Sequence, residues 1–240
     1  MPTNYWRSCI KNKDRQPTKN MSDIKAIIFD CDGTLVDSEP ITNGVIIGMA
    51  AEMGVSLTQD DCLDLFAGRN IACIGEHLAD QSGQAMPEDF VATFRNRQAI
   101  ALERDLRPIE GAVELLEQIE RPMFLASNAP REKISINLRV SGLRRFFPEE
   151  LVFSAYDREV WKPDPDLFFQ PAAHAGVAPE HCAVVEDSFA GLEAAARAGM
   201  QVFYFAPDGP AELPAELQKM PAIETMQVVT DLSQLAKWFC

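Results

Sequence analysis

The sequence has no stretch of about 18 consecutive apolar residues, the length that a helix needs to cross a bilayer. Positive charge is also scarce, because 22 Lys and Arg stand against 36 Asp and Glu and the formal net charge is −14. Nucleic acids and anionic membranes are bound by basic surfaces. We therefore expect neither a nucleic acid nor a membrane as a partner. The apolar fraction of 47% excludes a disordered chain.

Closely spaced cysteine pairs are missing as well. None of the six cysteines forms a C-x-x-C pair, and their spacings match no zinc module. The N-terminus has no apolar run that would serve as a signal peptide. Reduced thiols and a cytoplasmic location are the expectation.

Negative charge is nearly absent from residues 1–20, which carry five basic residues and one acid. This segment shows neither helical nor strand periodicity, so it is predicted to be a disordered extension. A basic transit-type presequence is the alternative. Met21 opens the part of the sequence that predicts regular structure.

From Met21 onward, short apolar runs alternate with helical patterns. The runs predict strands at 25–29, 122–126, 151–153, 182–185, 201–205 and, at an edge, 227–229. Helices are predicted between them at 111–119, 130–141, 165–175, 188–198 and 231–239. This alternation predicts an α/β fold, with a Rossmann-like parallel sheet and helices on both faces.

The stretch between the first two strands differs from the rest. Residues 40–107 contain no good strand pattern and predict helices at 40–53, 59–66, 70–81 and 87–104. We therefore expect an all-helical cap domain at 40–107, inserted into a core domain formed by 21–39 and 108–240. Such an insert could close over a site at the ends of the strands.

Ligands of open α/β sheets bind at the carboxyl ends of the strands. The first predicted strand is followed by Asp30-Cys31-Asp32-Gly33-Thr34. Buried carboxylates are costly unless they are paired, and a hard cation beside them would offset that cost. A turn or a helix cap is the alternative interpretation of this motif.

Polar residues follow three further strands. Ser127-Asn128 comes after the second strand, Lys162 stands in a Pro-rich loop after the third, and Glu186-Asp187 follows the fourth. Each has an ordinary alternative: helix capping for the first and last, and an exposed turn lysine for Lys162. Their joint occurrence after successive strands favours one shared crevice.

The four motifs closely resemble those of the haloacid dehalogenase-like hydrolase superfamily, over residues 21–210. The helical insert after the first motif resembles the small cap of the β-phosphoglucomutase-like subgroup. The resemblance implies that Asp30 is a nucleophile that forms an aspartyl-phosphate. It implies that Asp32 protonates the leaving oxygen and then activates water.

The resemblance also implies a ligand set. Mg²⁺ would bind Asp30, the Asp32 main-chain carbonyl and Asp187, and Glu186 would orient that site. The residues expected to contact the phosphate or the rest of the substrate are Gly33, Thr34, Ser127, Asn128, Lys162 and Arg69. Arg69 lies in Ala67-Gly68-Arg69-Asn70, which resembles the specificity loop of the cap, and a solvated surface arginine is the alternative.

The expected substrate is a small phosphorylated metabolite. Residues 161–165, 185–191 and 198–205 resemble the branch of bacterial 6-phosphogluconate phosphatases. A sugar phosphomutase is the alternative, but such mutases commonly carry a histidine where this sequence has Ile41-Thr42-Asn43. A non-catalytic regulator on the same fold is a further alternative, disfavoured because all the expected acids are present. We expect a monomer.

Overall fold

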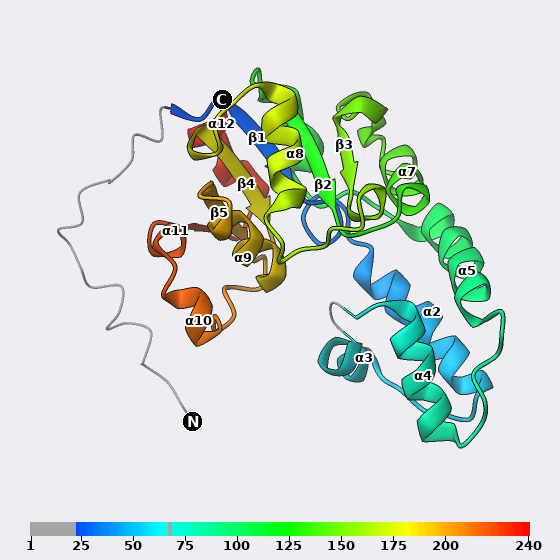
Figure 1. The fold of residues 1–240 in the computed structure, drawn as a ribbon. Helices are drawn as coiled ribbons and strands as arrows, with labels where there is room; N and C mark the ends of the chain where they lie inside the picture. Colours follow the sequence, from blue (N-terminus) through cyan, green and yellow to red (C-terminus); the bar gives the residue numbers. More distant parts are fainter. Residues whose placement is uncertain (1–22, 67–68) are drawn as a thin grey trace.

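The computed structural model describes residues 23–66 and 69–240, so the extension predicted at 1–20 lies outside the described residues. A six-stranded parallel sheet with strand order β3-β2-β1-β4-β5-β6 forms the centre of the molecule (Figure 1). Its strands are β1 (Ala26–Phe29), β2 (Met123–Ser127), β3 (Val152–Ser154), β4 (Cys182–Glu186), β5 (Gln201–Phe205) and β6 (Gln227–Val229). All six predicted strands are confirmed to within one residue at each end.

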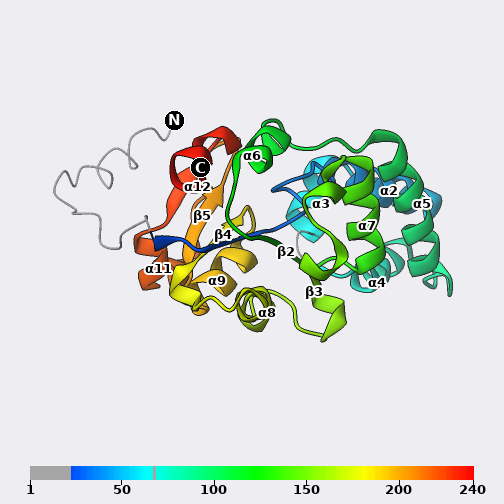
Figure 2. The ribbon, with the colours of Figure 1, turned by 90° about the horizontal axis from the view of Figure 1, so that it is seen from above.

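Helices cover both faces of this sheet, as Figure 2 shows from above. One face packs against α6 (Ala112–Gln118), α7 (Arg131–Val140) and α12 (Ala236–Phe239). The other packs against α8 (Asp166–Ala175), α9 (Phe189–Arg197), α10 (Ala215–Gln218) and α11 (Pro221–Glu224). Because side chains alternate along a strand, Ile27 and Phe29 enter the first layer and Ala26 and Ile28 the second. Strands buried on both faces need unbroken apolar runs, and β1 and β4 have them.

Several predicted helix bounds are corrected. Pro130, expected as the first helical residue, has extended backbone and precedes α7, which begins at Arg131. The helix predicted at 231–239 begins as a 3-10 turn, Leu232–Leu235, and only then becomes α12. Helices α10 and α11 were not predicted, since four residues are too few to show helical periodicity. No helix in the described ranges is long and apolar enough to cross a membrane.

The segment between β1 and β2 folds into α2 (Glu39–Glu52), α3 (Gln59–Phe66), α4 (Ile71–Ser82) and α5 (Phe90–Asp105). These four helices, called the insert below, extend away from the sheet (Figure 1). They bury an apolar cluster of their own, which includes Ile46, Leu78 and Phe94. The predicted helices are confirmed, although α5 starts at Phe90 because a turn precedes it. The predicted domain bounds, 39/40 and 107/108, stay predictions.

The two connections between the insert and the sheet lie side by side. Val36 and Pro108 form an antiparallel bridge, and Ile109 N donates to Leu35 O at 2.9 Å. This pairing, called the clasp below, joins the point where the chain leaves the sheet to the point where it returns.

Candidate active site

The carboxyl ends of β1, β2 and β4 bring the predicted motifs to one edge of the sheet. Phe29, the last residue of β1, is paired with Leu125 of β2 on one side and with Val185 of β4 on the other. Asp30 therefore follows the central strand, with Ser127 and Glu186 at the ends of its two neighbours. Parallel register alone is sufficient to gather these side chains.

Lys162 lies between two buried carboxylates. Its Nζ donates to Asp30 Oδ1 and, at 2.5 Å, to Glu186 Oε1. The Lys162 and Glu186 side chains are 2% and 0% exposed, so water screens these pairs little. Burial raises the pKa of Asp30 to about 7 although Lys162 opposes the shift. Burial also disfavours the charge of Lys162, but the two carboxylates outweigh it and raise the Lys162 pKa above its usual range.

Asn128 holds the loop that carries Lys162. The Lys162 main-chain N–H donates to Asn128 Oδ1 at 2.9 Å. The sequence predicted that Asn128 contacts the phosphate. In the structure its carbonyl oxygen is engaged by this loop, and its role toward substrate stays a prediction.

Asp187 packs against the turn that follows Asp30. Thr34 Oγ1 donates to Asp187 Oδ1 at 2.7 Å. Gly33 has a φ of +82°, and a Cβ there would lie 2.2 Å from Asp187 Oδ2, so only glycine fits. Burial raises the pKa of Asp187 well above its usual value, and the charges of Glu186 and Asp30 add to the effect.

Asp32 is held by a separate set of donors. Lys133 Nζ lies 2.8 Å from Asp32 Oδ1, Asn137 Nδ2 donates to the same oxygen at 2.9 Å, and Ser38 Oγ donates to it as well. Burial acts to raise the pKa of Asp32, but Lys133 and the other donors outweigh it and lower the pKa. The two aspartates of the first motif therefore differ in electrostatic environment.

Lys133 and Asn137 were not predicted as site residues. They lie four residues apart on α7, on the side that also buries Ile134 and Leu138. A polar residue within the apolar stripe of an amphipathic helix was the available signal. The motif pattern did not include it, because α7 begins several residues beyond the end of β2.

Ser127 and Arg69 differ in how far the structure connects them to the site. The Ser127 hydroxyl is buried and accepts the Ala129 N–H at 3.1 Å, so it folds the turn after β2 rather than capping α7. Arg69 is exposed, just before Asn70, which caps α4. No hydrogen bond or ion pair of the described residues joins Arg69 to the site, and its neighbours at 67–68 lie outside those residues.

The charges around Lys162 fit a divalent cation. Lys162 contacts the carboxylates of Asp30 and Glu186, and Asp187 adds a third carboxylate nearby, which leaves an excess of negative charge. Within the described ranges, no three Asp, Glu, His or Cys side chains form a ready metal cage. Mg²⁺ needs none, because it is bound through one or two carboxylates and keeps waters or substrate oxygens. In the predicted ligand set, Asp30 and Asp187 would supply the carboxylates, and the Asp32 carbonyl would be a third oxygen.

A substitution at Gly191 tests whether Glu186, a partner of Lys162, must be held in its position. A Cβ at Gly191 would lie 1.9 Å from Glu186 Oε1, and Ser188 N already donates to Glu186 Oε2 at 2.8 Å. Gly191→Ala is expected to displace Glu186 and to lower kcat by about 10²-fold, measured as phosphate release. The control is Gly48→Ala on α2, where a Cβ meets nothing within 4 Å and activity should not change. Equal activity of the two variants would show that Glu186 need not be fixed.

Known proteins resemble this chain in sequence over most of its length. Residues 24–199 match the family described as haloacid dehalogenase-like hydrolase. The chain is 35% identical to 6-phosphogluconate phosphatase of Escherichia coli, over 91% of this chain and 98% of that protein. It is 27% identical to hexitol phosphatase A of E. coli, over 88% of this chain and 95% of that protein.

A solved structure has the same fold as this chain. A HAD family hydrolase from Deinococcus radiodurans, crystallised with bound phosphate and sodium, superimposes with a TM-score of 0.73 at 30% identity. The match covers 91% of this chain and 98% of that one. Since the family match spans most of the chain and the relatives align over nearly their whole length, the protein belongs to the haloacid dehalogenase-like hydrolases.

Proposed function

We propose that the protein is a Mg²⁺-dependent phosphatase that hydrolyses a small phosphorylated metabolite through an aspartyl-phosphate. The observation that supports this most strongly is the pair of aspartates in the first motif. Asp30 lies among carboxylates beside Lys162, whereas Asp32 is neutralised separately by Lys133. This difference supports one carboxylate as the nucleophile and the other as the group that moves a proton.

In the first step, Asp30 attacks phosphorus and the bond to the leaving oxygen breaks, while Asp32 gives that oxygen a proton. Attack by an anion on an anionic phosphate needs positive charge nearby. Lys162 would supply part of it through Nζ, and the buried Ser127 hydroxyl would contact a phosphoryl oxygen. Bound at Asp30 and Asp187, Mg²⁺ would supply the remaining charge neutralisation.

In the second step, Asp32 takes a proton from water as the water oxygen attacks phosphorus. The bond between phosphorus and Asp30 breaks, and inorganic phosphate and the free carboxylate result. Asp32 thus takes back one proton for the one that it gave to the leaving oxygen. Phosphoryl transfer is mainly a matter of positioning and charge, which agrees with the many contacts that hold these two aspartates.

The proposed substrate is a sugar phosphate or sugar-acid phosphate, with 6-phosphogluconate first because the relative of that name aligns with 91% of this chain. We propose that the insert acts as the cap and that Arg69 contacts an anionic group of the substrate. The proposed setting is a monomer in the cytoplasm, where the described cysteines, which form no disulfide with one another, would stay reduced.

A panel of phosphorylated metabolites tests this function. Phosphate release should be fastest with one or a few sugar phosphates, 6-phosphogluconate among them, and should stop when EDTA removes Mg²⁺. Because the excess carboxylates must be neutralised before an anion can approach, we expect a loss of at least about 10²-fold in kcat without the metal. Full activity in EDTA would contradict the proposed requirement for Mg²⁺. No activity on any phosphate ester would favour a non-catalytic role.

One substrate distinguishes the proposed phosphatase from the mutase alternative. With β-glucose 1-phosphate, the protein is expected to release inorganic phosphate rather than form glucose 6-phosphate, because Thr42 and its neighbours supply no histidine. Coupled assays for both products measure the ratio. Efficient formation of glucose 6-phosphate would make the mutase the better proposal.

A further inference from the structure

The donors around Asp32 all meet the same oxygen. Lys133 Nζ, Asn137 Nδ2 and Ser38 Oγ each contact Oδ1. No hydrogen bond or ion pair in the described part of the chain engages Oδ2. One carboxylate oxygen is therefore fixed, and the other is left for proton exchange.

Two of these donors come from a rigid element. Lys133 and Asn137 are four residues apart and so lie on one side of α7, beside the buried Ile134 and Leu138. Asn137 is fully buried, and its Oδ1 has no hydrogen-bond partner among the described residues. Burying an unsatisfied polar atom costs about 1–3 kcal/mol. That Asn137 is present despite this cost indicates a use for its Nδ2 group, which donates to Asp32.

Lys133 also balances charge. Its ammonium neutralises Asp32 locally, whereas Lys162 is shared by Asp30 and Glu186. Without Lys133, the ionised Asp32 carboxylate, which is the form that takes a proton from water, would be repelled from its present position by Asp30. Geometry and charge therefore act in the same direction.

We infer that Lys133 and Asn137 are positioning residues for Asp32: by holding Oδ1 they aim Oδ2 at the leaving oxygen and then at the attacking water. The inference rests on the proposed phosphatase function. It assigns a role to one side of α7, a helix that contributes no residue to the four motifs.

Comparing two leaving groups distinguishes a loss of Asp32 positioning from a general loss of active protein. A sugar alkoxide needs the Asp32 proton as its bond to phosphorus breaks, whereas p-nitrophenolate leaves as a stable anion without it. The value of kcat/KM reports this first step for both substrates. The second step needs Asp32 as a base whichever substrate was used, so a misaimed Asp32 slows release of phosphate from Asp30.

Lys133→Met is the test, since methionine keeps the length of the side chain and removes its charge. Relative to wild type, kcat/KM for 6-phosphogluconate, or for the best sugar phosphate of the panel, should fall by about 10²-fold. For p-nitrophenyl phosphate it should fall by no more than about threefold. The same variant should show a rapid burst of p-nitrophenolate, about one per active site, followed by slow turnover.

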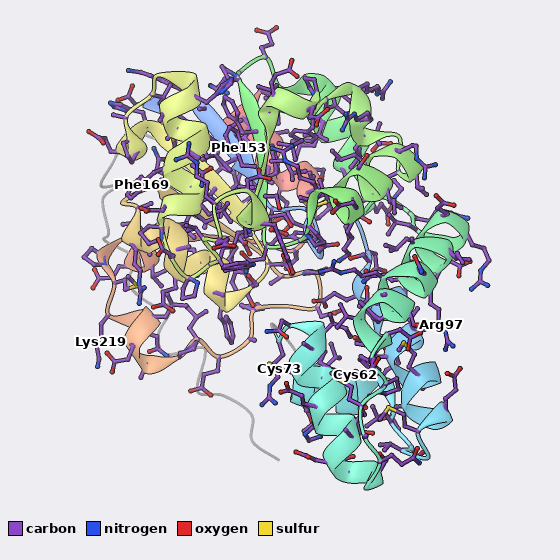
Figure 3. The ribbon with its side chains drawn as sticks, turned by 45° about the vertical axis from the view of Figure 1, so that its right-hand side comes forward. Cys62, Cys73, Arg97, Phe153, Phe169 and Lys219 are labelled. Atoms are coloured by element: carbon purple, nitrogen blue, oxygen red, sulfur yellow. The ribbon has the colours of Figure 1, made fainter. Side chains whose placement is uncertain are left out.

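The ratio of the two kcat/KM values does not depend on how much of a preparation is folded. Asn137→Ala should shift this ratio in the same direction even if it unfolds more easily, and Lys133→Arg should restore part of it. Lys219→Met is the matched control, because Lys219 directly follows α10 at the outer edge of the molecule and pairs only with Glu216 among the described residues (Figure 3).

Equal losses on both substrates, or no loss on either, would overturn the positioning role while leaving the phosphatase in place. A wild-type protein that hydrolyses no phosphate ester, or an Asp30→Asn variant that keeps full activity, would overturn the proposed function and this inference with it. A changed ratio together with the burst would support both.

Discussion

Asp30→Asn should abolish hydrolysis of every phosphate ester that the protein accepts. An amide cannot form the aspartyl-phosphate, so kcat is expected to fall by at least about 10⁴-fold, as for other enzymes that lose their nucleophile. The variant should still fold, because asparagine has the same shape and Lys162 keeps Glu186 as a partner. Phosphate release with the best sugar phosphate measures the loss, and Asp64→Asn, exposed on α3, is the control.

The same substitution should stabilise the protein in EDTA. The pKa of Asp30 rises from its usual 3.8 to about 7 on folding because of burial, so the folded state binds the proton more tightly than the unfolded state. The stability associated with this group is therefore full below about pH 4 and lost as the pH rises through 7. Asp30→Asn removes this dependence of stability on pH. The Tm of the variant in EDTA should therefore exceed that of wild type by a margin that grows between pH 5 and 8.

Thermal unfolding of both proteins across this range measures the difference. A lower Tm for Asp30→Asn at pH 8 would show that Lys162 more than compensates for the burial of Asp30. Mg²⁺ should reverse the order, because it binds ionised carboxylates and stabilises the wild type by mass action.

Lys162→Met should lose both activity and stability. Removing one partner of a buried ion pair leaves uncompensated charge and costs about 3–5 kcal/mol of unfolding free energy. Here the cost falls on Asp30 and Glu186 together, since one ammonium serves both. Activity should fall by about 10³-fold, because the phosphoryl group loses its fixed cation. Urea unfolding and phosphate release measure the two losses.

A double variant distinguishes charge from packing in this result. Lys162→Met with Glu186→Gln removes one positive and one negative charge, so it should regain part of the unfolding free energy without regaining activity. Lys219→Met, at an exposed pair, should change neither quantity. If the double variant is no more stable than Lys162→Met, the loss comes from packing in the site.

Most of the fold could be predicted because parallel strands buried on both faces leave a strong pattern. β1 and β4 consist of buried residues throughout, and an unbroken apolar run that ends in acids is difficult to mistake. Helices α10 and α11 were missed for the opposite reason: each is a single turn, stabilised by contacts with the sheet rather than by its own periodicity. Tertiary packing decides such elements, and local sequence does not reveal it.

The site was predicted where residues directly follow strands and missed where they do not. Asp30, Glu186 and Lys162 meet because strand register and one Pro-rich loop bring them together. Lys133 and Asn137 reach Asp32 from the buried side of α7, and that approach depends on how α7 is placed against the sheet. The orientation of a helix is a property of packed side chains, which no local motif encodes.

The clasp between Val36 and Pro108 constrains how this architecture can diverge. Because the chain departs and returns at neighbouring points, an inserted segment must bring its two ends together there, and the end of α5 also packs into the first layer through Leu102. A segment of another length or shape could be grafted between these ends without moving Asp30, which precedes the departure point. Under the proposed function, selection for new substrates could therefore act on the inserted segment while Asp30 and Lys162 keep their positions.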